Sequence, residues 1–249
     1  MKLAATKEMI RTEGLTRKYG AKTAVDGVNL SVREGELFAL LGVNGAGKTT
    51  TIRMLSCLAV PTAGEAFVDG KSCTKNPEEV KRIIGISPQD TAVAERLTVR
   101  ENLEFMAGLY SAEKALCRER TEKMTELFHL GEVLDQQART LSGGWKRKLS
   151  IAMAMIGEPR VLFLDEPTLG LDVLARRELW KLIGRLKEKR TIILTTHYME
   201  EAEQLSDRIA ILQKGRIRAC GTLADIEEKA GVSGLENAFV ALAGEEEER

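Results

Sequence analysis

The chain has few of the residues on which metal centres and disulfide frameworks depend. It contains two histidines and four scattered cysteines in 249 residues, with no CxxC motif and no histidine at ligand spacing. This pattern favours incidental thiols in a reducing compartment over a metal site. No apolar stretch approaches the roughly 18 residues that span a bilayer, and residues 1–14 lack an apolar signal region. We therefore expect a chain that is not secreted and does not cross a membrane by itself.

The chain also lacks an excess of either charge. Lysine and arginine total 37, as do aspartate and glutamate, so the formal net charge is zero. Because nucleic-acid binding usually requires a basic face, we expect no nucleic-acid partner. The single charge run, at 245–248, is expected to be a solvated tail.

Short apolar runs alternate with helical patterns along most of the chain. Continuous runs such as ELFALLG, RVLFLD and TIILTT are typical of buried parallel strands. The fold predicted is α/β: a P-loop NTPase core with a mostly parallel sheet, an N-terminal antiparallel β subdomain and a helical insertion. The predicted boundaries place the core at 1–90 and 144–222, the helical insertion at 91–143, and a C-terminal helix with the acidic tail at 223–249.

The segment GVNGAGKTT, at 42–50, follows an apolar run and precedes a helical pattern, which is the context of a phosphate loop. Backbone N–H groups here can hold a polyphosphate at the positive end of the helix. The residues predicted to bind nucleotide are Gly42, Asn44, Gly45, Ala46, Gly47, Lys48, Thr49 and Thr50. Lys48 would contact the β- and γ-phosphates and assist catalysis, and the Thr49 hydroxyl would bind Mg²⁺. The alternative is a glycine-rich turn that only caps a helix.

A second acidic element ends the apolar run VLFLDE at 161–166. Ligands bind at the carboxyl ends of parallel strands, so both carboxylates are expected at that edge. Asp165 is predicted to bind Mg²⁺, and Glu166 to orient and deprotonate the water that attacks the γ-phosphate. The alternative is that these acids only end a strand before Pro167.

These motifs, together with LSGG at 141–144, resemble those of the nucleotide-binding subunits of ABC transporters, in order from Tyr19 to about Gly221. LSGG is similar to the signature motif of that family, and LFLDEPTLGLD to its second strand motif running into the D-loop. The resemblance implies roles for four further residues: adenine stacking for Tyr19, Mg²⁺ or water contact for Gln89, γ-phosphate contact for His197, and a D-loop dimer contact for Asp172.

Each of these four roles has a structural alternative. A histidine at a strand end is often structural, a glutamine in a loop can be an ordinary amide, a tyrosine after a strand often only packs, and an aspartate there can cap a helix. The chain also departs from the family pattern at three positions. Val43 and Val173 stand where proline is common, and Trp145 stands where the signature most often has glutamine.

The resemblance implies a division of labour between two subunits. Ser142, Gly143 and Gly144 would reach the phosphates bound by a second copy or a homologous ATPase subunit, so that two subunits enclose two ATP molecules with Mg²⁺. A separate integral membrane permease would dock near Gln89 and the helices of 91–141. The chain would then lie in the cytoplasm, on the inner face of the membrane.

The surroundings LTVRENLEFMAGLY and TTHYMEEAEQLSDRIAIL resemble the ATPase subunits of ABC-2-type exporters of drugs, ions, antibiotics or polysaccharides. The alternatives are an importer ATPase, a non-transport ABC ATPase such as a cluster-assembly factor, and a binding module that does not hydrolyse ATP. The presence of both Glu166 and His197 argues against the last of these.

Trp145 has its own interpretation. With Ser142 as the N-cap, steps of four and three residues from Trp145 give Leu149, Ala152 and Ile156, an apolar stripe. The indole is therefore predicted to pack on the helix rather than to bind the anion.

Overall fold

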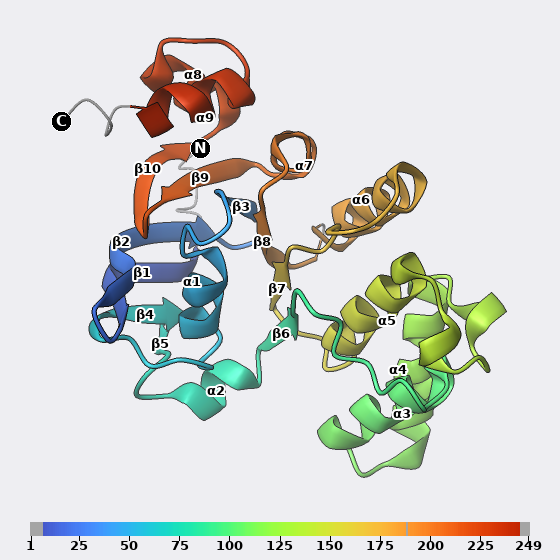
Figure 1. Ribbon diagram of the computed structural model, residues 1–249. Coiled ribbons are helices and arrows are strands. Elements are labelled where there is room, and N and C mark those ends of the chain that lie inside the picture. Colours follow the sequence, from blue (N-terminus) through green and yellow to red (C-terminus); the bar gives the residue numbers. More distant parts are fainter. Residues whose placement is uncertain (1–6, 188, 245–249) are drawn as a thin grey trace, which may run out of the picture.

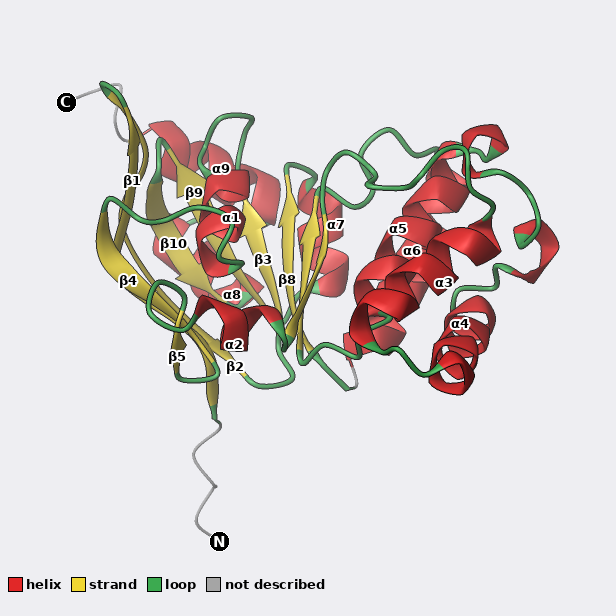
Figure 2. Cartoon of the chain, turned by 90° about the horizontal axis from the view of Figure 1, so that it is seen from below, coloured by secondary structure: helices red, strands yellow, loops and turns green. Residues whose placement is uncertain are grey.

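A computed structural model describes residues 7–187 and 189–244, in two sheets and a helical region. In Figure 2 the antiparallel strands lie at one end of the molecule, the central sheet in the middle, and α3 to α6 at the other end. The acidic run at 245–248 lies outside the described residues.

The smaller sheet is antiparallel, as predicted for the N-terminal part, with the order β2-β1-β4-β5. Its strands are β1 (Glu8–Tyr19), β2 (Lys22–Arg33), β4 (Ala63–Val68) and β5 (Lys71–Ser72).

The central sheet has the order β10-β9-β3-β8-β7-β6, and every neighbouring pair in it is parallel except the β9–β10 hairpin. Its strands are β3 (Leu37–Leu41), β6 (Ile84–Ser87), β7 (Val161–Asp165), β8 (Thr191–Thr196), β9 (Arg208–Gln213) and β10 (Arg216–Gly221). Strands β3, β7 and β8 are buried along their whole length, which is why their sequences are almost continuously apolar. The predicted mostly parallel sheet is confirmed.

Helices flank the central sheet and continue beyond it (Figure 1). They are α1 (Lys48–Leu55), α2 (Pro77–Lys81), α3 (Val99–Tyr110), α4 (Lys114–Leu127), α5 (Gly143–Met155), α6 (Val173–Lys187), α7 (Met199–Leu205), α8 (Leu223–Ala230) and α9 (Leu235–Gly244), with short 3-10 turns at Gly131–Val133 and Ala138–Thr140. Among the residues that the structure describes, none of these helices is long and apolar enough to cross a membrane.

Helix α1 lies between the two sheets. Its buried Ile52 and Leu55 share a core with Val28 of β2 and with Phe38 and Phe163 of the central sheet. Burying a leucine or isoleucine side chain contributes about 1.5–3 kcal/mol. The helix that carries the phosphate loop is therefore held on both faces.

A second core joins α3, α4, α5 and α6 to the central sheet, where Leu37 of β3, Leu162 of β7 and Ile192 of β8 belong to it. Helix α3 begins with a capping box, in which Thr98 Oγ1 accepts from the Glu101 N–H at 3.1 Å and Glu101 Oε2 accepts from the Thr98 N–H at 2.7 Å. The buried Asn102 exchanges hydrogen bonds with the backbone of Ala94. These contacts fix the chain between β6 and α3. The division of the chain into domains at 90, 143 and 222 stays a prediction.

The C-terminal segment differs from the single helix expected there. Two short helices, α8 and α9, are separated by Gly231 and Gly234, whose φ angles are 66° and 85°. Glycine adopts this left-handed conformation without the steric cost that other residues incur. The two glycines therefore end one helix and set the direction of the next.

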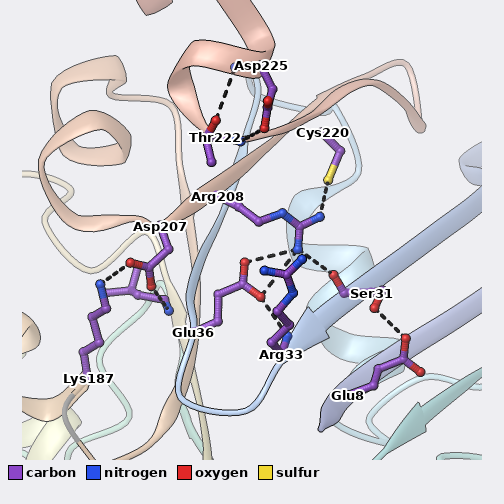
Figure 3. Close-up of polar contacts among 11 residues, drawn as sticks. Glu8, Ser31, Arg33, Glu36, Lys187, Asp207, Arg208, Cys220, Thr222 and Asp225 are labelled. Carbon is purple, nitrogen blue, oxygen red and sulfur yellow. Dashed lines mark hydrogen bonds and ion pairs between the residues drawn. The ribbon is translucent and has the colours of Figure 1, made fainter. Parts of the chain in front are cut away.

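A polar cluster ties the two sheets together at the N-terminal ends of the parallel strands (Figure 3). Arg208 Nη1 lies 3.2 Å from Glu36 Oε1 and donates to the carbonyl of Ser31 in β2 at 3.1 Å. Glu36 is 6% exposed and also accepts the N–H of Arg33. Because a buried carboxylate needs such partners, this contact fixes β2 against β3 and β9.

Candidate nucleotide-binding site

A cleft of about 400 Å³ opens where the parallel strands end. Strands β3, β6, β7 and β8 run in one direction, so the residues that follow them meet at one edge of the sheet. The cleft is lined by Tyr19, Lys22, Ala24, Asn44, Gly45, Ala46, Gly47, Lys48, Thr49, Thr50, Gln89 and Glu166. The structure thus brings together most of the residues predicted to bind nucleotide.

The phosphate loop requires glycine where its backbone passes close to other chain segments. Gly47 has a φ angle of 108°, and a Cβ there would lie 2.5 Å from the carbonyl oxygen of Ala24. A Cβ at Gly42 would collide with the backbone of Leu212 in β9. The Ala46 carbonyl accepts the N–H of Gly215 at 2.9 Å, so the β9–β10 turn supports the loop from behind.

Lys48 is buried at the base of the loop, with 5% exposure. Its Nζ donates to the carbonyl of Gly42 at 2.6 Å and to that of Val43 at 3.2 Å. The same atom lies 3.0 Å from Glu166 Oε1. The ammonium group is therefore aimed across the cleft at the second acidic element, where an anionic ligand would meet it.

Asp165 and Thr49 lie side by side although they are far apart in sequence. Thr49 Oγ1 donates to Asp165 Oδ1 at 3.1 Å, and the buried Thr195 donates to the same carboxylate oxygen. A hydroxyl and a carboxylate are hard oxygen donors, and Mg²⁺ is commonly held by one or two such groups together with phosphate oxygens and water. The residues present therefore fit a Mg²⁺ ion bound with a nucleotide.

Glu166 has an uncommon backbone conformation for a residue with a side chain. Its φ angle is 49°, and its N–H donates to both the carbonyl and the hydroxyl of Thr195, at 3.1 and 3.0 Å. Its carboxylate lies between two partners, because Oε2 is 2.7 Å from His197 Nδ1 and Oε1 contacts Lys48. Such strained conformations persist where surrounding contacts fix them, and they cluster at functional sites.

The remaining cleft residues are more exposed. Gln89, which follows β6, is exposed at the rim of the cleft, and Tyr19 is 44% exposed. The Arg17 guanidinium lies 4.6 Å from the centre of the Tyr19 ring. Tyr19 therefore lines the cleft with an exposed ring, and its contact with adenine stays a prediction.

The signature residues Ser142, Gly143 and Gly144 are not among those that line the cleft. They begin α5, and both overall views place α5 across the central sheet from α1 (Figures 1 and 2). Ser142 is exposed and occupies the N-cap position, but its side chain makes no capping hydrogen bond. Its hydroxyl is therefore not committed to its own helix.

Asp172 has the helix-capping contacts that were the structural alternative for it. Its Oδ1 accepts the N–H groups of Leu174 and Ala175, each at 2.9 Å. A Cβ at Gly144 would lie 3.3 Å from the Cβ of Ala175, so the signature segment and the start of α6 are neighbours. A contact of Asp172 with a second subunit stays a prediction.

Trp145 is half-buried against the core of the helical region, as the stripe predicted, and Leu149, Ala152 and Ile156 are fully buried there. The Lys148 ammonium lies 4.5 Å from the centre of its ring. The indole thus has packing partners in its own subunit.

Two functional neighbours were not predicted from the sequence. Thr195 bonds both acids, and its only signal was a polar pair ending the apolar run TIILTT. Arg147 donates to the carbonyls of Pro88 and Gln89, 59 and 58 residues away in sequence. Nothing local in the sequence indicates these contacts of Arg147 with Pro88 and Gln89.

A mostly parallel sheet defines a P-loop NTPase when a glycine-rich phosphate loop with a buried lysine follows β3 and two acids end β7, the next strand but one in the sheet. The sequence model of the ABC transporter family matches residues 25–169. The chain belongs to the ABC transporter family, and it is one of the ATPase cassettes of that family.

Two relatives illustrate the similarity. The chain is 42% identical over 210 residues to the human phospholipid-transporting ATPase ABCA3. The matched region covers 84% of this chain but only 12% of that protein. It is 43% identical over 223 residues to the daunorubicin/doxorubicin resistance ATP-binding protein DrrA of Streptomyces peucetius, covering 89% of this chain and 68% of that one.

Solved structures agree with these relatives. The ATP-binding subunit of an ABC transporter superposes with a TM-score of 0.84 at 33% identity, covering 94% of this chain and 99% of that one. The dimeric cassette MJ0796 with ADP and phosphate, in a post-hydrolysis state, gives a TM-score of 0.77 at 27% identity, covering 86% and 99%.

Proposed function

We propose that the chain is the ATPase subunit of an exporter, and that it works as a dimer enclosing two MgATP and drives a separate membrane permease. The observation that carries this proposal is the position of Ser142, Gly143 and Gly144, which do not line the cleft of their own subunit. A second copy placed head to tail would supply them. The dimeric state of MJ0796 supports this arrangement.

Within one subunit, the phosphate loop binds the triphosphate of ATP. The backbone N–H groups of the loop and the positive end of α1 hold the phosphates, and Lys48 contacts the β- and γ-phosphates. Thr49 and Asp165 would hold Mg²⁺, and Gln89 at the rim would be a further ligand of the ion or of its water. When bound, Mg²⁺ offsets the negative charge that grows on the phosphates.

Glu166 serves as the general base. The water that attacks the γ-phosphate lies between that phosphate and the carboxylate, which orients the water and accepts its proton, while the bond from the γ-phosphorus to the bridging oxygen breaks and ADP leaves. His197 holds the second carboxylate oxygen and faces the γ-phosphate. Tyr19 stacks on the adenine ring at the outer end of the cleft.

The partner copy completes the site. The start of α5 contacts the γ-phosphate held by the other subunit. The contacts come from the Ser142 hydroxyl, from backbone N–H groups that the glycines at 143 and 144 leave accessible, and from the positive end of the helix. Asp172 lies at the dimer contact. Hydrolysis then removes contacts on both sides and lets the two subunits separate.

The partner that is moved when the two subunits close and separate is a membrane permease. Helix α3 presents Phe105, Leu109 and Tyr110, with exposures of 59%, 66% and 44%, next in sequence to the Gln89 loop. Apolar side chains exposed together are typical of protein interfaces. We propose that a permease docks here, which places the chain at the cytoplasmic face of the membrane. The names of the two relatives favour export of a lipid or a drug-like compound over import.

The substitution Glu166→Gln tests the proposal. The variant keeps the side-chain volume but cannot accept the proton, so it should bind MgATP, release phosphate at least about 100-fold more slowly, and accumulate as a dimer. Gel filtration with and without MgATP measures the dimer. A variant that stays monomeric with MgATP, or that hydrolyses at the wild-type rate, contradicts the proposal.

Lys48→Ala is the companion variant. Loss of the ammonium group should weaken equilibrium binding of ATP by about 100-fold. Lys22→Ala is the matched control, because Lys22 also lines the cleft but is exposed, and it should change affinity by less than about fivefold. Equal affinities for the Lys48→Ala variant and the wild type would contradict the phosphate-loop assignment.

A further inference from the structure

Arg147 is a buried cation that joins the signature helix to the rim of the nucleotide cleft. It is 4% exposed and lies in the second turn of α5, three residues after Gly144. Nη1 donates to the carbonyl of Pro88 and Nη2 to that of Gln89, both at 2.7 Å. One guanidinium group therefore holds two consecutive peptide units of the loop that follows β6.

Ser150, three residues further along α5, makes a second contact with the same segment. Its hydroxyl lies 2.9 Å from that of Ser87, and both residues are buried. Side chains three residues apart lie on one face of a helix. One face of α5 thus holds three consecutive residues at the end of β6: Ser87, Pro88 and Gln89.

Three acids act on the charge of Arg147. Burial lowers the pKa of its guanidinium, and the negative charges of Asp165, Asp90 and Glu201 oppose that effect. Nε has no hydrogen-bond partner among the described residues and is buried. The two hydrogen bonds that hold the Arg147 side chain therefore both go to the backbone of Pro88 and Gln89.

We propose that Arg147 is a positioning residue that sets Gln89 relative to the phosphate loop and Glu166, and that carries any displacement of α5 directly to Gln89. The inference rests on the proposed function, in which a second copy contacts the start of α5. Contact of Ser142 with the nucleotide of the other subunit would then change the place of Gln89 in its own subunit. One side chain would thereby link the two sites of the dimer.

Arg147→Met in the full-length chain tests this link. The variant removes both bonds and leaves the phosphate loop intact, so kcat for ATP hydrolysis should fall about tenfold while KM for MgATP stays within about twofold. Arg147→Lys keeps the charge but cannot bond both carbonyls in the same way, and should lose activity to an intermediate extent. It also remains informative if the methionine variant does not fold.

A double-mutant cycle with Gln89→Ala distinguishes positioning from a general structural role. If Arg147 acts through Gln89, Arg147→Met should change kcat by less than about twofold once Gln89 is alanine. A further tenfold loss in that background overturns the proposal. Lys148→Met is the control, because it removes a neighbouring charge of α5 that pairs with Glu178. An Arg147→Lys variant that is as active as the Lys148→Met variant also overturns the proposal.

The same experiment separates this inference from the proposed function. Suppose that the wild-type chain hydrolyses ATP and the Glu166→Gln variant dimerises, while Arg147→Met and Gln89→Ala lower kcat additively. In that case only the role of Arg147 is wrong. If the wild type shows no hydrolysis and Glu166→Gln no dimer, the proposed function itself fails.

Discussion

Lys48 Nζ lies 3.0 Å from Glu166 Oε1, and both side chains are only 5% exposed. The lysine that would bind the γ-phosphate is thus paired with the carboxylate that would activate water. A nucleotide must take the ammonium group from Glu166 as it binds. Glu166 would keep His197 as a partner for its other oxygen, so it is released toward the water without being left unpaired.

This pairing predicts a gain in affinity when the carboxylate is removed. Glu166→Gln deletes a negative charge beside the phosphates and weakens the competitor for Lys48, so ATP should bind about three- to tenfold more tightly, equivalent to about 1 kcal/mol. Equilibrium titration without Mg²⁺ measures the effect apart from hydrolysis. Glu178→Gln is the control, because Glu178 pairs with Lys148 on the surface of α6. Unchanged or weaker binding by the Glu166→Gln variant would show that the pair does not compete with nucleotide.

Replacing glycine by alanine should weaken ATP binding at Gly47 and stabilise the fold at Gly184. Gly47→Ala places a Cβ 2.5 Å from the Ala24 carbonyl oxygen at a φ of 108°, so the loop must shift and ATP affinity should fall at least about tenfold. Gly184 lies within α6 with open space around it, and Gly184→Ala should raise the free energy of unfolding by about 0.5–1 kcal/mol. Urea unfolding and ATP titration of both variants check this. An intact affinity in the Gly47→Ala variant would mean that the loop tolerates the shift.

Most of the fold could be predicted because its signals are local. The runs at 161–165 and 191–196, each with an apolar centre, are buried parallel strands, and Pro77 begins a helix as its position indicates. The phosphate loop could be predicted for the same reason, since its glycines and Lys48 lie within nine consecutive residues. The break between α8 and α9 was missed, although Gly231 and Gly234 were the local signal for it.

Contacts between distant segments could not be predicted in this way. The pairing of Lys48 with Glu166 depends on how β3 and β7 flank β8, and the bonds from Arg147 to the loop after β6 depend on the seating of α5. For Asp172, the sequence left a helix cap and a dimer contact open, and the structure supplies the cap. Its two N–H partners lie two and three residues away, so the cap was the more local of the two roles.

A buried carboxyl behind the site predicts a pH-dependent stability. Glu201 is fully buried, its Oε1 accepts the Trp180 Nε1–H at 3.0 Å, and burial raises its pKa above the ordinary value. Between the unfolded and the folded pKa the folded state binds a proton that the unfolded state has released. The stability that Glu201 contributes is therefore fully present below about pH 4.5 and is lost as the pH rises through the folded pKa.

Glu201→Gln removes this titration, so the variant should gain stability relative to the wild type as the pH rises. The gain should grow by up to about 1.4 kcal/mol per pH unit between the two pKa values. Urea unfolding at about pH 5 and about pH 8 measures it. Glu200→Gln, on the exposed side of the same first turn of α7, is the control and should show no such trend. A stability difference independent of pH would mean that Glu201 is ionised in the folded protein throughout.

Trp145 predicts a separation of stability from activity. Its ring packs on the core of the helical region beneath the Lys148 ammonium, and these contacts lie within one subunit. Trp145→Gln should therefore lower the free energy of unfolding by about 1 kcal/mol through lost apolar and cation–π contact. The ATPase rate should stay within about threefold, because the proposed anion contacts come from Ser142 and from backbone N–H groups. Lys148→Met, which removes the cation and keeps the indole, should cost less stability than Trp145→Gln. A tenfold or greater gain in ATPase rate in the Trp145→Gln variant would show instead that this position contacts the partner subunit, and that glutamine there makes a bond that the indole cannot.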